Sequence, residues 1–221
     1  MKIVFKRIIA YMIDIIIVSV ISTLITSNSY INKDYNKYIN TYEEYEKFYD
    51  EYEESIEGLQ ESLEYEAITE EEYNSKLDKL NNDYNDKSVD YNYKLVKLSI
   101  IPTIISTLIL LLYFVVIQYY LGGKTLGKRI MKLRVVNKND RKLNIFNFLL
   151  RSLILNNVLI NLLSVLMIII LSKKGYILYN EIIYIINYVI EMAIVFMLLF
   201  DKNNRGLHDY IANTKVVYEG E

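Results

Sequence analysis

Residues 8–26 read IIAYMIDIIIVSVISTLIT and contain a single charged side chain, that of Asp14. Comparable apolar runs follow at about residues 98–121, 152–171 and 182–200. A helix of roughly 20 apolar residues is long enough to cross the hydrocarbon core of a bilayer. The sequence therefore predicts an all-α integral membrane protein in which these four runs are the membrane-spanning helices.

The lysine and arginine residues predict how these spans are oriented. Lys2, Lys6 and Arg7 precede the first span, and the loop 122–144 is strongly basic, whereas the short loop before the fourth span has only Lys173 and Lys174. Because positively charged loops stay in the cytoplasm, we expect both termini, the loop 122–144 and the tail 201–221 on that side. Residues 28–97 are then extracytoplasmic. The length of the first span and its Asp14 favour a retained helix, 1–27, over a cleaved signal peptide.

Residues 28–97 differ in composition from the rest of the chain. They hold 19 of the 27 acidic residues and eight basic ones, a net charge of −11. Apolar and aromatic residues recur there at alternating spacings of three and four, the pattern of a heptad seam. They are Tyr35, Tyr38, Tyr42, Tyr45, Tyr49, Tyr52, Ile56, Leu59 and Leu63, and then Tyr73, Leu77, Leu80, Tyr84 and Tyr91, where Lys87 interrupts the second series. Thr69 and Glu72 fit a capping box for the second helix. The pattern predicts an antiparallel helical hairpin, a coiled-coil stalk, inserted between spans one and two.

Two interpretations of this stalk stay open. It could dock an extracytoplasmic protein partner or pair with a second copy of the chain. Alternatively, it is a solvated coiled coil whose tyrosine seam only holds its two arms together, as charged runs are usually solvated faces.

Several classes of function are disfavoured by what the sequence lacks. There is no cysteine and one histidine, His208, so we expect no cofactor and no metal site. Residues 122–128, GGKTLGK, match part of a phosphate-binding loop, but Arg129 replaces the Ser or Thr and no strand precedes them. His208 and Asp209 are adjacent without a candidate nucleophile, so we do not expect an enzyme. We also expect no nucleic-acid partner.

Asp14 and Arg7 are candidate functional residues of the first span. An ionised carboxylate inside a membrane is costly unless it meets a partner or water. Arg7 lies two helical turns earlier, on the same face. The pair is either an ion- or proton-linked site or a structural clamp, with Asp14 bonded to a neighbouring helix and Arg7 reaching the headgroups.

Glu191 lies in the middle of the fourth span, the most costly depth for a charge. With Asp14 it supplies two carboxylates, and nearby asparagines add neutral oxygen ligands. Such a set suits a proton or a hard monovalent cation. The alternative is hydrogen bonding between helices. The asparagines are Asn156, Asn157, Asn161 and Asn187.

The basic loop 122–144 predicts contacts with the lipid bilayer. Clusters of lysine and arginine next to a span bind anionic headgroups. The residues that we expect to make these contacts are Lys124, Lys128, Arg129, Lys132 and Arg134.

Three separate motifs resemble the RDD family of bacterial polytopic membrane proteins, over about residues 3–26 and 98–217. The first is Arg7 with Ala10 and Asp14. The second is residues 123–129, GKTLGKR, followed by LRVV at 133–136 and Leu150-Arg151. The third is the tail with Asp201, RGLHD at 205–209, ANT at 212–214 and Val216-Val217.

The resemblance implies a location in the bacterial cytoplasmic membrane and, for some members, cation/proton exchange. The family is named for one Arg and two Asp. Arg7 and Asp14 match the first two positions, and the second Asp is Asp209, with Asp201 as the alternative. We thus expect transport of a small ligand or cation/proton exchange through Arg7, Asp14, Glu191 and Asp209. The alternative is an anchored assembly protein whose stalk recruits a partner.

Overall fold

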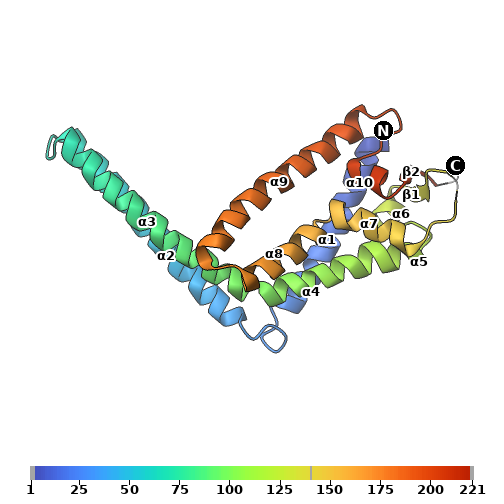
Figure 1. Cartoon of the computed structure of the whole chain (residues 1–221), viewed down its shortest axis with the longest axis horizontal. Coiled ribbons are helices and arrows are strands. Elements are labelled where there is room, and N and C mark those ends of the chain that lie inside the picture. The colour runs from blue at the N-terminus through green and yellow to red at the C-terminus, as the bar shows by residue number, and fades with distance from the viewer. Residues whose placement is uncertain (1–2, 140, 220–221) are drawn as a thin grey trace. The chain divides into compact units, whose positions relative to one another are not determined.

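The computed structural model describes residues 3–139 and 141–219, and it is mostly helical. The chain forms two compact units. The first, Met1–Ile31 with Ile101–Glu221, is called the apolar unit, and the second, Asn32–Ile100, is called the Tyr/Glu unit. Figure 1 labels their helices and strands.

Among the described residues, three helices are long and apolar enough to cross a membrane. They are α1 (Ile3–Thr26), the continuous helix Ile100–Tyr120, and α9 (Lys173–Phe200). The second consists of α4 (Ile100–Leu111), the π-helical segment η1 (Leu112–Ile117) and α5 (Gln118–Tyr120). Three of the four predicted spans therefore correspond to single helices in the structure.

The third predicted span, residues 152–171, is not one straight helix. It is divided between α7 (Ile145–Leu155) and α8 (Val158–Ile170), which are bent by 65° at the break. Asn157 has a φ of 53°, a left-handed conformation that asparagine tolerates better than most residues and that a helix cannot contain. Two consecutive asparagines, Asn156 and Asn157, thus interrupt the apolar run.

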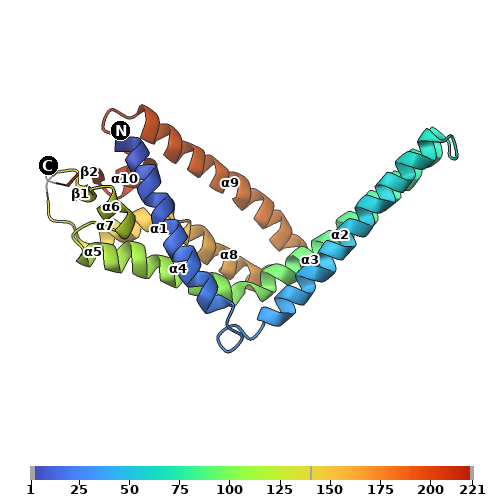
Figure 2. The same ribbon diagram turned by 180° about the vertical axis from the view of Figure 1, so that it is seen from behind.

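The segments expected to be loop and tail are folded. Residues 122–144 contain α6 (Leu126–Ile130) and β1 (Leu133–Asn137), and the C-terminal segment contains α10 (Leu207–Ile211) and β2 (Thr214–Tyr218). The strands pair antiparallel, with Val135 opposite Val216. Figures 1 and 2 show α6, α7, α10 and both strands gathered at one end of the apolar unit, beside the start of α1. The all-α prediction missed this small sheet.

The core of the apolar unit lies where the sheet meets the helices. Leu133, Val135 and Val216 from the strands pack with Ala10 of α1, Val115 of η1 and Phe148 of α7. The strands alternate buried and partly exposed residues, as expected of a sheet with one covered face. This core joins the first half of α1 to the two folded segments.

The Tyr/Glu unit contains α2 (Tyr35–Glu64) and α3 (Glu70–Leu98), which lie side by side. The Tyr52 ring stacks on Tyr84 with centroids 4.1 Å apart, and Tyr45 lies 5.4 Å from Tyr91. The two helices therefore run antiparallel and meet through residues of the predicted seam. The predicted capping box of Thr69 and Glu72 is also present.

Candidate functional site

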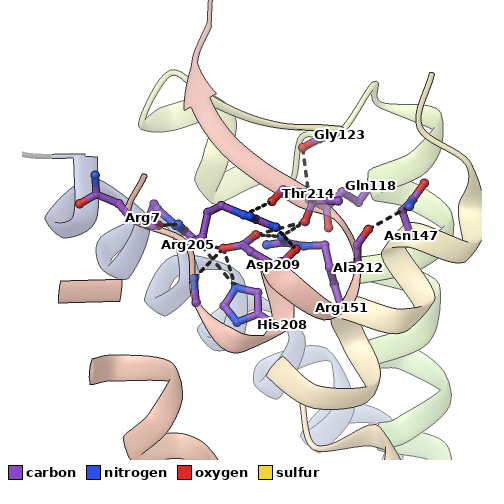
Figure 3. Close-up of polar contacts among 12 residues, drawn as sticks. Arg7, Gln118, Gly123, Asn147, Arg151, Arg205, His208, Asp209, Ala212 and Thr214 are labelled. Carbon is purple, nitrogen blue, oxygen red and sulfur yellow. Dashed lines mark hydrogen bonds and ion pairs between the residues drawn. The ribbon is translucent and has the colours of Figure 1, made fainter. Parts of the chain in front are cut away.

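Asp209 is the centre of a buried cluster of charged residues (Figure 3). It lies on α10, is fully buried, and forms ion pairs with Arg7 of α1, over 2.5 Å, and with Arg151 of α7. The Gly206 amide donates to the same carboxylate over 3.1 Å, and the Thr214 hydroxyl donates over 3.2 Å. One carboxylate thus ties α1, α7, α10 and β2 together.

Both arginines also make a further hydrogen bond. Arg7 donates to the carbonyl of Asn204, and Arg151 donates to the Thr214 hydroxyl over 2.7 Å. Burial by itself raises the pKa of Asp209, but the charges of Arg151 and Arg7 outweigh it and hold the pKa well below its usual range. Asp209 therefore remains ionised at neutral pH and acts as a fixed countercharge.

His208 is buried beside this cluster. Burial lowers its pKa to about 3, although Asp209 opposes the shift, so the imidazole is neutral at pH 7. Its Nε2 lies 3.3 Å from an amino nitrogen of Arg7, and a neutral ring can accept that hydrogen bond.

The buried His208 predicts a loss of stability in mild acid. Between its ordinary pKa of 6.5 and about 3, the unfolded chain binds a proton at this site that the folded chain does not, so the free energy of unfolding falls as the pH falls. From about pH 6.5 to 5 the expected loss is on the order of 2 kcal/mol. It is measured as the thermal unfolding midpoint of detergent-solubilised protein across a pH series.

The control for this prediction is His208→Gln, which keeps a polar side chain that does not titrate. His208 is the single histidine in the sequence, so the midpoint of the variant is expected to be flat over the same range. A wild-type midpoint that does not change between pH 7 and 5 contradicts the prediction.

Asp14 forms a second buried cluster. It is fully buried and accepts hydrogen bonds from the Tyr113 hydroxyl over 2.6 Å, the Thr125 hydroxyl, and the Gly127 amide over 2.7 Å. Lys128 lies 3.8 Å away, and burial lowers the pKa of this lysine to about 8 although Asp14 opposes the shift. Asp14 therefore holds the first turn of α6 against α1, whereas Arg7, the other residue of the predicted pair, binds Asp209 instead of reaching the headgroups.

A glycine allows this close approach. A Cβ at Gly127 would lie 2.1 Å from the carbonyl oxygen of Ala10 and 3.0 Å from the carboxyl carbon of Asp14. Since Ala10 is itself small and 1% exposed, the two backbones nearly touch. Ala10 and Asp14 are one helical turn apart on the same face of α1, and Gly127 of α6 packs against this face.

A cavity of about 470 Å³ lies beside both clusters, within the apolar unit. Its charged lining residues are Arg7, Lys128, Arg151 and Glu191, and its polar ones are Tyr11, Asn157 and His208. The rest of the wall is apolar. The predicted carboxylates Asp14 and Asp209 are not among the lining residues, whereas their partners Lys128, Arg7 and Arg151 are.

Glu191 is the acidic residue among those lining the cavity. It accepts hydrogen bonds from the side-chain amides of Asn157, over 3.2 Å, and Asn187, over 2.9 Å. The break between α7 and α8 is next to it, since Leu155 and Asn157 also line the cavity. Among the described residues, no ion pair to Glu191 accompanies these amides.

The residues predicted to contact lipid headgroups have different environments. Lys124 pairs with Glu219, and Lys128 is buried against Asp14. Arg129 and Lys132 are exposed, and Arg134 is half-buried on β1. Asp201, the alternative second aspartate, accepts hydrogen bonds from the Tyr210 hydroxyl and the Arg205 amide and has no ion pair with Arg7 among the described contacts.

Comparison with protein families assigns the chain. The sequence model of the family described as RDD family matches residues 3–213. The chain belongs to the RDD family. No curated protein and no solved structure matches it.

In this RDD protein, Arg7 pairs with Asp209, and Asp14 secures the short helix that begins the basic segment. Arg151, Tyr113 and Thr125 were not predicted from the sequence as site residues. Arg151 stands directly before the predicted span 152–171, where a cation is expected at the membrane boundary. Tyr113 and Thr125 are neutral. Their role depends on distant partners, which spacing along the chain does not reveal.

Proposed function

We propose that this RDD protein is a secondary transporter that exchanges a monovalent cation for a proton, and that both ions bind Glu191. The observation that carries the proposal is the position of Glu191, on the cavity wall beside a broken helix and hydrogen-bonded by neutral amides. A carboxylate that is held by neutral amides, with no ion pair among the described contacts, can bind either ion.

The surroundings of Glu191 offer further oxygen ligands. The Asn187 side-chain oxygen is buried and has no hydrogen-bond partner among the described residues. At the break, the freed Leu155 carbonyl accepts a hydrogen bond from Tyr11. Discontinuous helices supply such carbonyls, and the negative end of a half-helix, at cation sites of many transporters. We include α7 and α8 in the proposal as one broken span.

The charges of the site favour competition between the two ions. With His208 neutral, the carboxylates Asp14, Asp209 and Glu191 balance Arg7, Lys128 and Arg151. The neighbouring guanidinium of Arg205 is left out of this count, because it has the carboxylate of Asp201 as its own countercharge. A proton or a monovalent cation at Glu191 leaves the same single excess charge, so binding of one disfavours binding of the other. In this proposal Asp14 and Asp209 hold the frame and do not exchange ions.

The proposed topology is that of a four-span protein of the cytoplasmic membrane, with both termini inside and the Tyr/Glu unit outside. Four spans are few for alternating access, so the proposal includes a functional homo-oligomer. It involves ion movement alone and no catalytic residue.

Proton movement in proteoliposomes tests the proposal. With a trapped pH dye, imposed gradients of sodium, potassium or lithium are expected to move protons in the wild type, and Glu191→Gln is expected to reduce this movement to that of empty liposomes. Glu181→Gln, on the same helix but outside the cavity lining, is the matched control and keeps the flux. Wild-type flux in Glu191→Gln, or no flux from folded wild type with any of the three ions, contradicts the proposal.

A second candidate function is recruitment of a partner by a coiled-coil stalk. It is favoured by a groove of about 580 Å³ on the Tyr/Glu unit, lined by Tyr42, Tyr45, Tyr49 and Tyr84 with the acidic Glu46 and Asp50. Aromatic faces beside carboxylates attract basic side chains. Deleting residues 30–95 separates the two candidates. Ion exchange that persists after the deletion supports the transporter, with the stalk as an accessory. Loss of function while the rest of the chain stays folded supports recruitment by the stalk.

A further inference from the structure

We propose that a basic pocket at the end of the second candidate span binds the phosphate of an anionic lipid headgroup. The pocket has a volume of about 570 Å³ and lies between α5, β1 and α7. It is separate from the Glu191 cavity, and the inference does not depend on ion exchange.

The charge of the pocket selects an anion. Its lining includes Arg134 of β1 and Arg141 and Lys142 of the following segment, and no acidic residue is among the described lining residues. Nearby, the carboxylate of Glu219 pairs with Lys124 and is also attracted by Arg134. Three cations converging on one concavity are a recurrent arrangement for phosphate groups, and arginine adds bidentate hydrogen bonding.

The position of the pocket selects a lipid as the source of that phosphate. Tyr119 and Tyr120 line it at the C-terminal end of the apolar helix Ile100–Tyr120. The Tyr120 side chain is 78% exposed. Tyrosines at the end of a span mark the headgroup level, and basic pockets next to spans bind anionic headgroups there. Apolar lining residues such as Leu143 and Phe148 suit the glycerol and first acyl carbons.

The adjoining glycine turn does not act as a phosphate-binding loop. The Gly122 and Gly123 amides donate to the carbonyls of Tyr119 and Gln118, over 3.1 and 2.9 Å, and are unavailable to a ligand. Gly123 has a φ of +87°, and a Cβ there would lie 2.3 Å from the Val135 carbonyl oxygen. These glycines therefore shape the turn against β1, and the side chains of Arg134, Arg141 and Lys142 hold the phosphate.

The test is lipid binding by the full-length, delipidated protein in neutral detergent, followed by native mass spectrometry. Phosphatidylglycerol is the probe, with phosphatidylcholine and inorganic phosphate as comparison arms. The wild type is expected to retain phosphatidylglycerol in preference to both. The double variant Arg141→Gln/Lys142→Gln, which changes two exposed side chains, is expected to weaken this binding by about tenfold or more.

The matched control is Lys138→Gln/Lys202→Gln, which removes two exposed cations of the same unit that neither line the pocket nor belong to the predicted headgroup contacts. It is expected to change the affinity by less than about threefold. An equal loss in both double variants would show diffuse attraction and overturn the proposal. Equal retention of phosphatidylcholine, or equally strong binding of inorganic phosphate, would overturn the lipid assignment.

Discussion

Asp209→Asn is expected to destabilise the apolar unit by roughly 3–5 kcal/mol, the usual effect of removing one partner of a buried ion pair. Asparagine has nearly the shape of aspartate, so the loss comes from charge. Arg7 and Arg151 have side chains that are 8% and 5% exposed, and both pair with Asp209. Without the carboxylate, two buried guanidinium groups repel each other with no countercharge between them. The measurement is the thermal unfolding midpoint, or the yield of monodisperse protein in detergent.

Asp201→Asn is the matched control, because Asp201 is an aspartate of the same C-terminal segment with a more exposed side chain. Its carboxylate accepts hydrogen bonds from Tyr210, Arg205 and Asn203, and these contacts are near the surface. The expected loss is about 1 kcal/mol or less. If Asp209→Asn unfolds no more readily than Asp201→Asn, the buried cluster does not hold these elements together.

Gly127→Ala is expected to cost roughly 2–4 kcal/mol, the sum of overpacking and of weakened hydrogen bonds to a buried carboxylate. The added methyl group cannot occupy its ideal position, which is 2.1 Å from the Ala10 carbonyl oxygen. Neither atom can turn away, because the backbones of the two packed helices fix both positions. Helix α6 must move away from α1, which lengthens the bonds from Thr125 and Gly127 to Asp14. Unfolding midpoints of the variant and the wild type measure the loss.

Gly175→Ala provides the comparison within the same unit. A Cβ at this helical position of α9 meets its nearest atom, the Ser172 hydroxyl oxygen, at 3.4 Å, which is an ordinary contact. The substitution is expected to be neutral or to stabilise by about 0.5–1 kcal/mol, because alanine favours helix more than glycine does. Equal effects of Gly127→Ala and Gly175→Ala would contradict the close packing of α6 on α1.

The helices were predictable because their signals are local. Apolar runs of sufficient length identified α1, α9 and the helix Ile100–Tyr120, and the Thr69–Glu72 capping box identified the start of α3. The break at Asn157 was missed, because the helix period continues through two asparagines and only the backbone conformation shows the bend. Strands β1 and β2 were missed because each has five residues and finds its partner about 80 positions away along the chain.

The candidate site was predictable in its residues and not in its pairing. Arg7, Asp14, Glu191 and Asp209 were all singled out, but Arg7 was associated with Asp14 because they share a face of α1. In the structure Arg7 pairs with Asp209 and Asp14 binds α6, so one helix face serves two separate clusters. An ionisable residue within an apolar run can be recognised from the sequence alone, whereas its partner is determined by the tertiary structure.

The two aspartates and Glu191 have different roles in this proposal. Asp14 and Asp209 each have cationic partners and backbone donors, and these contacts stabilise the frame around the cavity. Glu191 has amide partners and lines the cavity itself. Loss of either aspartate is expected to act through folding, and loss of Glu191 through ion binding alone.

Proton release on cation binding tests the role of Glu191 most directly. Saturating sodium, potassium or lithium is added to weakly buffered, detergent-solubilised protein, and the pH change is recorded for the wild type, Glu191→Gln and the control Glu181→Gln. At starting pH values at which Glu191 carries a proton, competition at this carboxylate predicts release of up to about one proton per chain from the wild type and Glu181→Gln, and none from Glu191→Gln. Equal release from Glu191→Gln, or no release from folded wild type with any of these ions, would show that Glu191 is not the shared site.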